Sequence, residues 1–90
     1  MEFIKLANAW SYQLSEWDNL QKEDIEEALS DINGLVIEDY TMAPESDIWR
    51  LFYNGCEFRL VNDLVYGCDI RTTDQDDLST MEKLIKKLDI

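Results

Sequence analysis

The sequence predicts an α+β domain, in which two amphipathic helices pack on one face of an antiparallel sheet of four to five strands. Residues 48–70 read as three short strands folded back on one another, and two other segments carry apolar residues at helical spacing. The elements follow the order strand(s), helix, strands, helix, which favours two layers. Ninety residues are enough for a single domain with one modest core.

The first fourteen residues have strand character in two pieces, 3–6 and 9–14. In the second piece, aromatic and aliphatic residues alternate with polar ones, as in a half-buried strand. The sequence leaves open whether the pieces form one irregular strand or a hairpin through Asn8 and Ala9.

The first helix is expected to begin between Ser15 and Asp18. Asp18 with Gln21 forms one possible capping box, and Ser15 with Asp18 forms a competing one. Asn33 and Gly34 are expected to end the helix. An apolar stripe at helical spacing predicts the face that packs on the sheet, and it consists of Ile25, Ala28, Leu29 and Ile32.

After a strand at 35–42, Asn54 and Gly55 stand between two runs of aromatic and aliphatic residues. This is the strongest short-range signal for a β-hairpin, and a type I′ turn fixes its register. The register predicts three cross-strand pairs on the side that faces the core: Tyr53 with Cys56, Leu51 with Phe58, and Trp49 with Leu60.

The opposite side of this hairpin, the outer sheet face, carries arginines among apolar residues. One interpretation is a solvated surface on which the arginine stems lie. The other is a binding surface, since arginine beside aromatic and aliphatic residues is typical of interfaces. The candidate contact residues are Ile48, Arg50, Phe52, Arg59 and Val61, with Val65 as a further apolar contact in a self-associated form.

A third strand is expected over Leu64–Thr72. A three-residue loop with a bulge would keep its apolar residues on the core side and place Arg71 beside the other arginines. The resulting pairs are Leu60 with Leu64, Phe58 with Tyr66, and Cys56 with Cys68. Free buried thiols are expected at both cysteines, although this register would also allow a disulfide.

The last helix is expected to begin with Thr73 or Asp74 as its cap. Acidic residues in its first turn and lysines in its last turns complement the helix dipole. Its apolar stripe consists of Leu78, Met81, Leu84, Ile85 and Leu88.

Twenty acidic and eight basic residues give a net charge of −12, which disfavours direct binding to nucleic acid or to anionic membranes. Carboxylates gather on the outward side of the first helix, where few cations compensate them. We call this surface the acidic helix face, and it consists of Glu23, Asp24, Glu27 and Asp31. It is either a solvated helix face or an electrostatic docking surface for a basic partner.

The chain lacks the residues that most catalytic sites need. The chain has no histidine, which excludes histidine-based catalytic and metal sites, and no glycine-rich phosphate loop. Residues 74–77 resemble a calcium loop only faintly, because the glycine and glutamate that such a loop needs are missing. We therefore expect no catalytic, cofactor-binding or metal-binding residues and no enzyme.

The sequence predicts a non-catalytic protein-binding module, inhibitor-like or adaptor-like, that docks a basic protein through the acidic helix face. Small acidic α+β proteins include immunity proteins, antitoxins and phage-encoded inhibitors, and the chain is similar to these bacterial and phage proteins in type. Two alternatives stay open: a homo-oligomer that uses the outer sheet face, and an acidic nucleic-acid mimic. No apolar run could span a bilayer and residues 1–3 do not open a secretory signal, so a cytoplasmic location is expected.

Overall fold

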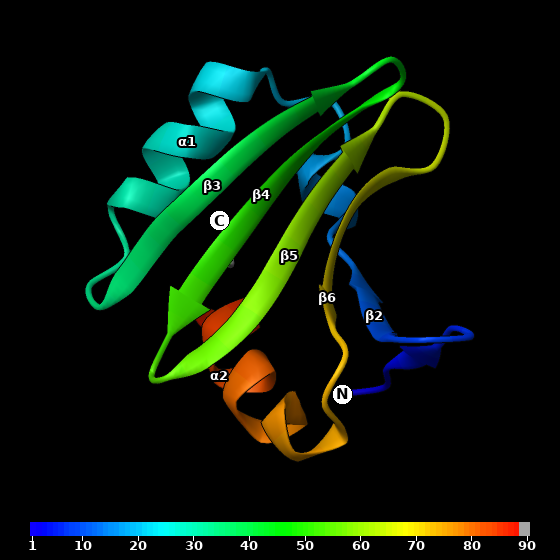
Figure 1. Cartoon of the computed structure of the whole chain (residues 1–90). Coiled ribbons are helices and arrows are strands. Elements are labelled where there is room, and N and C mark those ends of the chain that lie inside the picture. Colours follow the sequence, from blue (N-terminus) through cyan, green and yellow to red (C-terminus); the bar gives the residue numbers. More distant parts are fainter. Residues whose placement is uncertain (89–90) are drawn as a thin grey trace.

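Six strands and two α-helices follow one another in the order ββαββββα in the computed structural model, which describes residues 1–88 (Figure 1). The strands are β1 Ile4–Lys5, β2 Trp10–Gln13, β3 Leu35–Ala43, β4 Ser46–Tyr53, β5 Cys56–Asp63 and β6 Gly67–Thr72. The helices are α1 Lys22–Ser30 and α2 Leu78–Leu88, with short 3₁₀ turns η1 Ser15–Trp17 and η2 Gln75–Asp77 ahead of them. The α+β class is confirmed, but the sheet has six strands and not four to five.

All neighbouring strands are antiparallel, and they lie in the order β1-β2-β6-β5-β4-β3. The two N-terminal pieces form a hairpin, which settles the question that the sequence left open. Strand β2 pairs with β6, so this hairpin extends the sheet beyond β3–β6, and its two strands make six with the four strands that follow α1. None of the helices in the described part of the chain is long and apolar enough to cross a membrane.

The β4–β5 hairpin has the predicted register along its whole length. Asn54 and Gly55 have φ angles of 51° and 80°, as a type I′ turn requires. Trp49 lies opposite Leu60, and the arginines at 50 and 59 lie opposite each other on the outer side. Sequence alternation and turn chemistry agree here, and the structure confirms both.

The predicted pairing of β5 with β6 is wrong. Leu60 lies opposite Ile70 and not Leu64, because β5 continues through Asp63 and the chain turns three residues later than expected, at 64–66. The slip is six residues, from 64 to 70. It is an even number, so Ile70 still faces the core, as predicted.

The revised register separates the two cysteines. Cys56 lies opposite Tyr53 at one end of β5, whereas Cys68 lies opposite Asn62 at the other, and both are free thiols. Cys68 is fully buried, and burial raises its pKa to about 12. Cys56 is only half-buried. The predicted juxtaposition of these thiols is therefore wrong.

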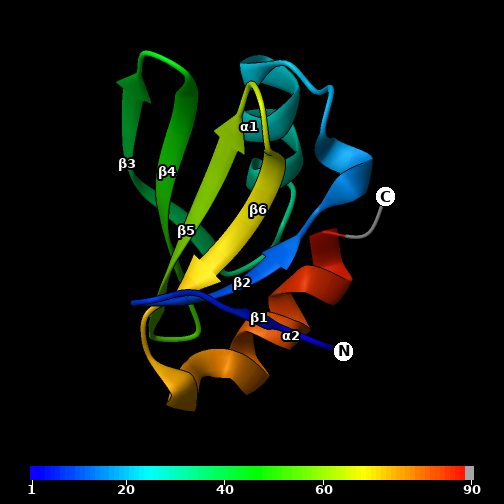
Figure 2. The same cartoon turned by 90° about the vertical axis from the view of Figure 1, so that its right-hand side faces the viewer.

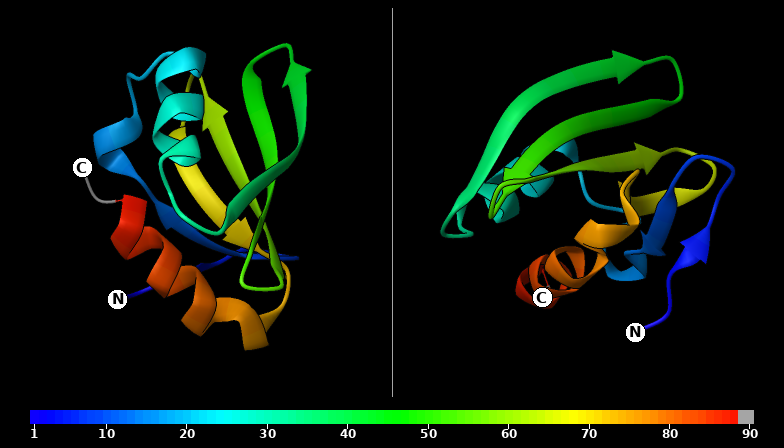
Figure 3. Two further views of the ribbon diagram at one scale, coloured as in Figure 1. Left: turned by 90° about the vertical axis from the view of Figure 1, so that its left-hand side faces the viewer. Right: turned by 60° about the horizontal axis from the view of Figure 1, so that its bottom comes forward.

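Both helices cover the same face of the curved sheet, and the other face carries no helix (Figures 2 and 3). The core lies between these layers, and Trp49, Leu51, Phe58 and Leu60 are at most 1% exposed within it. A fully buried large apolar side chain stabilises the fold by roughly 1.5–3 kcal/mol. The burial of these four side chains confirms that this side of the β4–β5 hairpin faces the core, as predicted.

Helix α1 begins at Lys22, later than predicted, and it has no capping box. Gln21 at the N-cap makes no side-chain cap hydrogen bond. The Asp18 carboxylate instead accepts a hydrogen bond of 3.1 Å from the backbone N–H of Cys68, so it ties η1 to the sheet. The predicted stripe is confirmed, with Ile25 and Leu29 fully buried.

Helix α2 begins at Leu78, later than expected, because the residues after the predicted cap form the 3₁₀ turn η2. The Asp74 carboxylate accepts a 2.9 Å hydrogen bond from the backbone N–H of Asp76, so Asp74 is the cap of the η2 turn that leads into the helix. The buried members of the predicted stripe are Met81, Leu84, Ile85 and Leu88, and Leu78 packs partly buried beside them.

Candidate binding surfaces

The outward side of α1 brings the four predicted carboxylates of the acidic helix face together. Glu23, Asp24, Glu27 and Asp31 are all exposed. The nearby Lys22 is engaged elsewhere, since its ammonium lies 3.1 Å from Glu26. Within residues 1–88, none of the four forms an ion pair within 4.0 Å. The acidic helix face is therefore charged and accessible.

Glu26 belongs to the same helix but has a structural role. Its carboxylate accepts hydrogen bonds from the indole N–H of Trp49 at 3.0 Å and from Lys22 at 3.1 Å. These hydrogen bonds, first that of Trp49 and then that of Lys22, lower the pKa of Glu26. Lys22 also lies 4.6 Å from the ring centre of Tyr40 on β3. Together these contacts fix α1 to strands β3 and β4 of the sheet.

A groove of about 420 Å³ adjoins the N-terminal end of α1, and we call it the acidic groove. The segment between η1 and α1 lines it, together with residues at the ends of β4 and β5. Its carboxylates are Asp18, Glu23, Asp47 and Asp63. Asp47 accepts a 2.5 Å hydrogen bond from the hydroxyl of Tyr40, which raises the tyrosine pKa to about 12.

The loop between β5 and β6, residues Leu64, Val65 and Tyr66, exposes three large apolar side chains in succession. They are 84%, 70% and 81% exposed, whereas the expected register placed Leu64 and Tyr66 in the core. We call these three residues the apolar loop. A signal for it exists in the sequence, since Asp63 and Gly67 bracket the segment as turn residues do, but the apolar character of the three residues favours a strand.

The outer sheet face carries all three arginines in one row across β4, β5 and β6. The guanidinium of Arg50 lies 3.6 Å from Glu57. Arg71 contacts the buried Asp69 at 2.6 Å. In residues 1–88, Arg59 has no carboxylate within 4.0 Å. Two of the three arginines are thus neutralised within the chain.

The apolar part of the outer sheet face is less accessible than expected. Val61 is only 9% exposed, and Ile48 and Phe52 are half-buried. Asn8 and Ala9, in the turn between β1 and β2, line a pocket of about 300 Å³ together with Ile48 and Val61.

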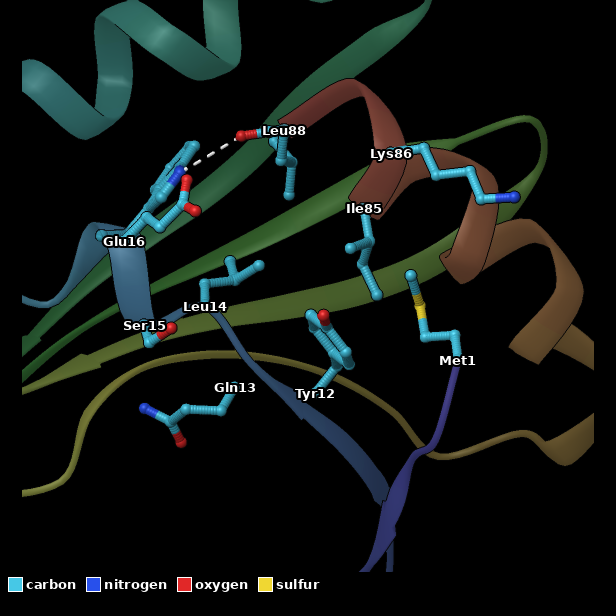
Figure 4. Close-up of a pocket in the computed structure, with 10 residues that line it drawn as sticks. Met1, Tyr12, Gln13, Leu14, Ser15, Glu16, Ile85, Lys86 and Leu88 are labelled. Atoms are coloured by element: carbon cyan, nitrogen blue, oxygen red, sulfur yellow. Dashed lines mark hydrogen bonds between the residues drawn. The ribbon is translucent and has the colours of Figure 1, made fainter. Parts of the chain in front are cut away.

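A pocket of about 180 Å³ lies between β2 and α2, and Tyr12, Leu14 and Ile85 project into it (Figure 4). The indole of Trp17 donates a hydrogen bond of 3.2 Å to the backbone carbonyl of Leu88 at its rim. The lining combines apolar side chains with the polar side chains of Gln13, Ser15 and Glu16. Among the residues that the structure describes, no group of three or more metal-ligating side chains occurs.

Comparison of the chain with protein-family models, with curated proteins and with solved structures gives no match. Any function must therefore be argued from the surfaces described above.

Proposed function

We propose that the chain is a non-catalytic protein-binding module that docks a basic partner through the acidic helix face. The observation that carries the proposal is a row of four exposed carboxylates on one helix, Glu23, Asp24, Glu27 and Asp31, none of which is paired within residues 1–88. Carboxylates four residues apart on a helix repel one another. Such a row costs stability in the free protein and gains favourable interactions only when a cation approaches.

The surroundings of the helix support this assignment. Lys22 and Glu26 turn toward the sheet and engage each other, Tyr40 and Trp49, so the four outer carboxylates stand on a firmly seated helix. A fixed charged surface attracts a partner of opposite charge over long range and raises the rate of association. The net charge of −12 adds to this effect.

The test begins with proteins captured from cells that produce the chain. Each captured protein is purified, and its association rate is measured against the wild-type chain and against a face variant, E23Q/D24N/E27Q/D31N. At low salt the face variant should associate roughly tenfold or more slowly, and its rate should depend less on salt.

A matched control removes four carboxylates elsewhere, in the variant E2Q/E16Q/E38Q/D76N. Both variants lose the same charge, so a general effect of net charge would slow both equally. Equal association rates for the face variant and this control would contradict the proposal.

A further inference from the structure

The apolar loop has no role in the acidic helix face or in the core. Single apolar residues are common on protein surfaces, but contiguous exposed patches mark interaction sites. Leu64, Val65 and Tyr66 are each at least 70% exposed at the tip of one loop, where polar turn residues are usual. This is the largest run of exposed apolar residues in the described chain.

Hydrogen bonds between the loop backbone and the side chains of Asp63 and Gln13 order the loop. The Asp63 carboxylate accepts the N–H groups of Val65 at 2.8 Å and Tyr66 at 3.0 Å. The side-chain amide of Gln13 donates to the carbonyl of Tyr66 at 3.0 Å. A loop that is already ordered loses little conformational entropy when it binds. Its backbone is therefore ordered before a partner binds.

The loop lies beside the turn between β3 and β4, at the same end of the sheet (Figures 1 and 2). The backbone N–H of Leu64 donates to the carbonyl of Glu45 in that turn at 2.9 Å. Near this turn Met42 is 77% exposed and lies opposite Asp47. Leu64 also lines the acidic groove, whose carboxylates include Asp47 and Asp63. Leu64 thus joins the apolar loop to the carboxylates of the acidic groove.

The combination of apolar side chains and nearby carboxylates indicates which kind of partner fits the loop. A second copy of the chain would bring another net charge of −12 and the same carboxylates to the contact, and an anionic membrane would be repelled in the same way. A protein with an apolar pocket edged by lysine or arginine complements both parts of the surface. Tyrosine is moreover enriched among the residues that dominate binding energy.

We infer that the apolar loop is a preformed anchor, which inserts Leu64, Val65 and Tyr66 into an apolar pocket of a partner protein while basic residues at the rim of that pocket lie over the acidic groove. The inference rests on the proposed function in that the chain binds a protein. It adds a second contact that is apolar and that meets the acidic helix face only at Glu23, in the acidic groove.

The experiment places the photo-crosslinking residue p-benzoylphenylalanine at position 66 of the full chain, in cells that produce it, with position 79 on the exposed side of α2 as the control site. Position 66 should cross-link to a protein other than the chain itself, and position 79 should not. That protein is then purified, and its affinity is measured for the wild-type chain and for L64S/V65S/Y66S. We expect the triple variant to bind about 30-fold more weakly or worse.

The triple variant should fold normally because its side chains lie largely in solvent, and circular dichroism checks this. If it fails to fold, the single variant Y66S replaces it, with an expected loss of about tenfold. Four results would overturn the inference: no cross-link specific to position 66, a cross-link only to a second copy, flotation of the chain with phosphatidylcholine vesicles that the triple variant abolishes, or equal affinity of the loop variant.

The face variant, measured against the same purified partner, separates this inference from the proposed function. If the face variant binds normally and the loop variant does not, the role of the acidic helix face is refuted and the anchor stands. If the loop variant binds normally and the face variant does not, the anchor is refuted and the proposed function stands.

Discussion

At Gly67 the backbone has a φ of +81°, and a β-carbon added there would lie 2.5 Å from a carboxylate oxygen of Asp18. That oxygen accepts the N–H of Cys68, so it cannot move without breaking the hydrogen bond. The shape of the apolar loop depends on this close approach, because Gly67 is where the chain returns to the sheet.

Replacement of Gly67 by alanine should therefore destabilise the protein by about 2–3 kcal/mol, of which roughly 1–2 kcal/mol comes from the left-handed backbone and the rest from the disturbed hydrogen bond. Urea unfolding measures the change. Gly55→Ala is the matched control, since its φ is +80° and nothing lies within 4 Å of an added β-carbon. Equal losses for the two variants would show that Asp18 does not constrain the loop.

At the scale of elements, the attachment of α1 to the sheet involves a charged group as well as the apolar stripe. The folded-state pKa of Glu26 lies below its ordinary value of 4.5, so the folded protein favours the ionised carboxylate. The stability that this carboxylate contributes is fully present above about pH 4.5. It is lost as the pH falls through the lower pKa of the folded state.

The variant Glu26→Gln should thus be less stable than the wild type at pH 7, by up to about 1 kcal/mol. The difference should shrink as the pH is lowered through 4.5 to 3. Urea unfolding of both proteins at several pH values measures it, and comparison of the two cancels the titration of the other carboxylates. A difference that stays constant with pH would contradict the role of ionised Glu26.

Helix α1 should also be more stable without part of its acidic face. Glu27 has a like charge four residues away on each side, and Asp31 stands at the C-cap, where the helix dipole disfavours a negative charge. The variant E27Q/D31N should gain roughly 0.5–1 kcal/mol, as thermal unfolding would show, whereas Glu2→Gln should change little. A loss of stability in E27Q/D31N would mean that these carboxylates stabilise the fold.

The elements differ in how well the sequence predicts them, and the reason is local. Asn54 and Gly55 specify their turn by backbone conformation alone, so the β4–β5 register follows from a few residues. The β5–β6 turn instead depends on a hydrogen-bonded carboxylate and on an approach to Asp18, fifty residues away along the chain. Such a distant contact leaves no trace in the alternation of Leu64–Thr72.

The candidate surfaces show the same difference between features set by the local sequence and features set by distant contacts. The acidic helix face was predictable because helical spacing alone places Glu23, Glu27 and Asp31 on one side. The apolar loop was not, because alternation assigns apolar residues to the core.

For the molecule as a whole, the two helices lie on the inner side of the sheet (Figure 3), and the core lies between these layers. The outer sheet face has two of its arginines neutralised within the chain. The acidic helix face and the apolar loop meet at the acidic groove, where Glu23 and Leu64 are both lining residues. A partner that covers the groove could therefore contact both.

This surface exists only if β5 and β6 pair as described, so their register is the most direct test. Nuclear Overhauser effects between backbone protons report which residues face each other across two strands. We expect them between Leu60 and Ile70 and between Val61 and Asp69, with none from Leu60 to Leu64. Contacts between Leu60 and Leu64, or between Phe58 and Tyr66, would place the apolar loop inside the sheet and contradict the account.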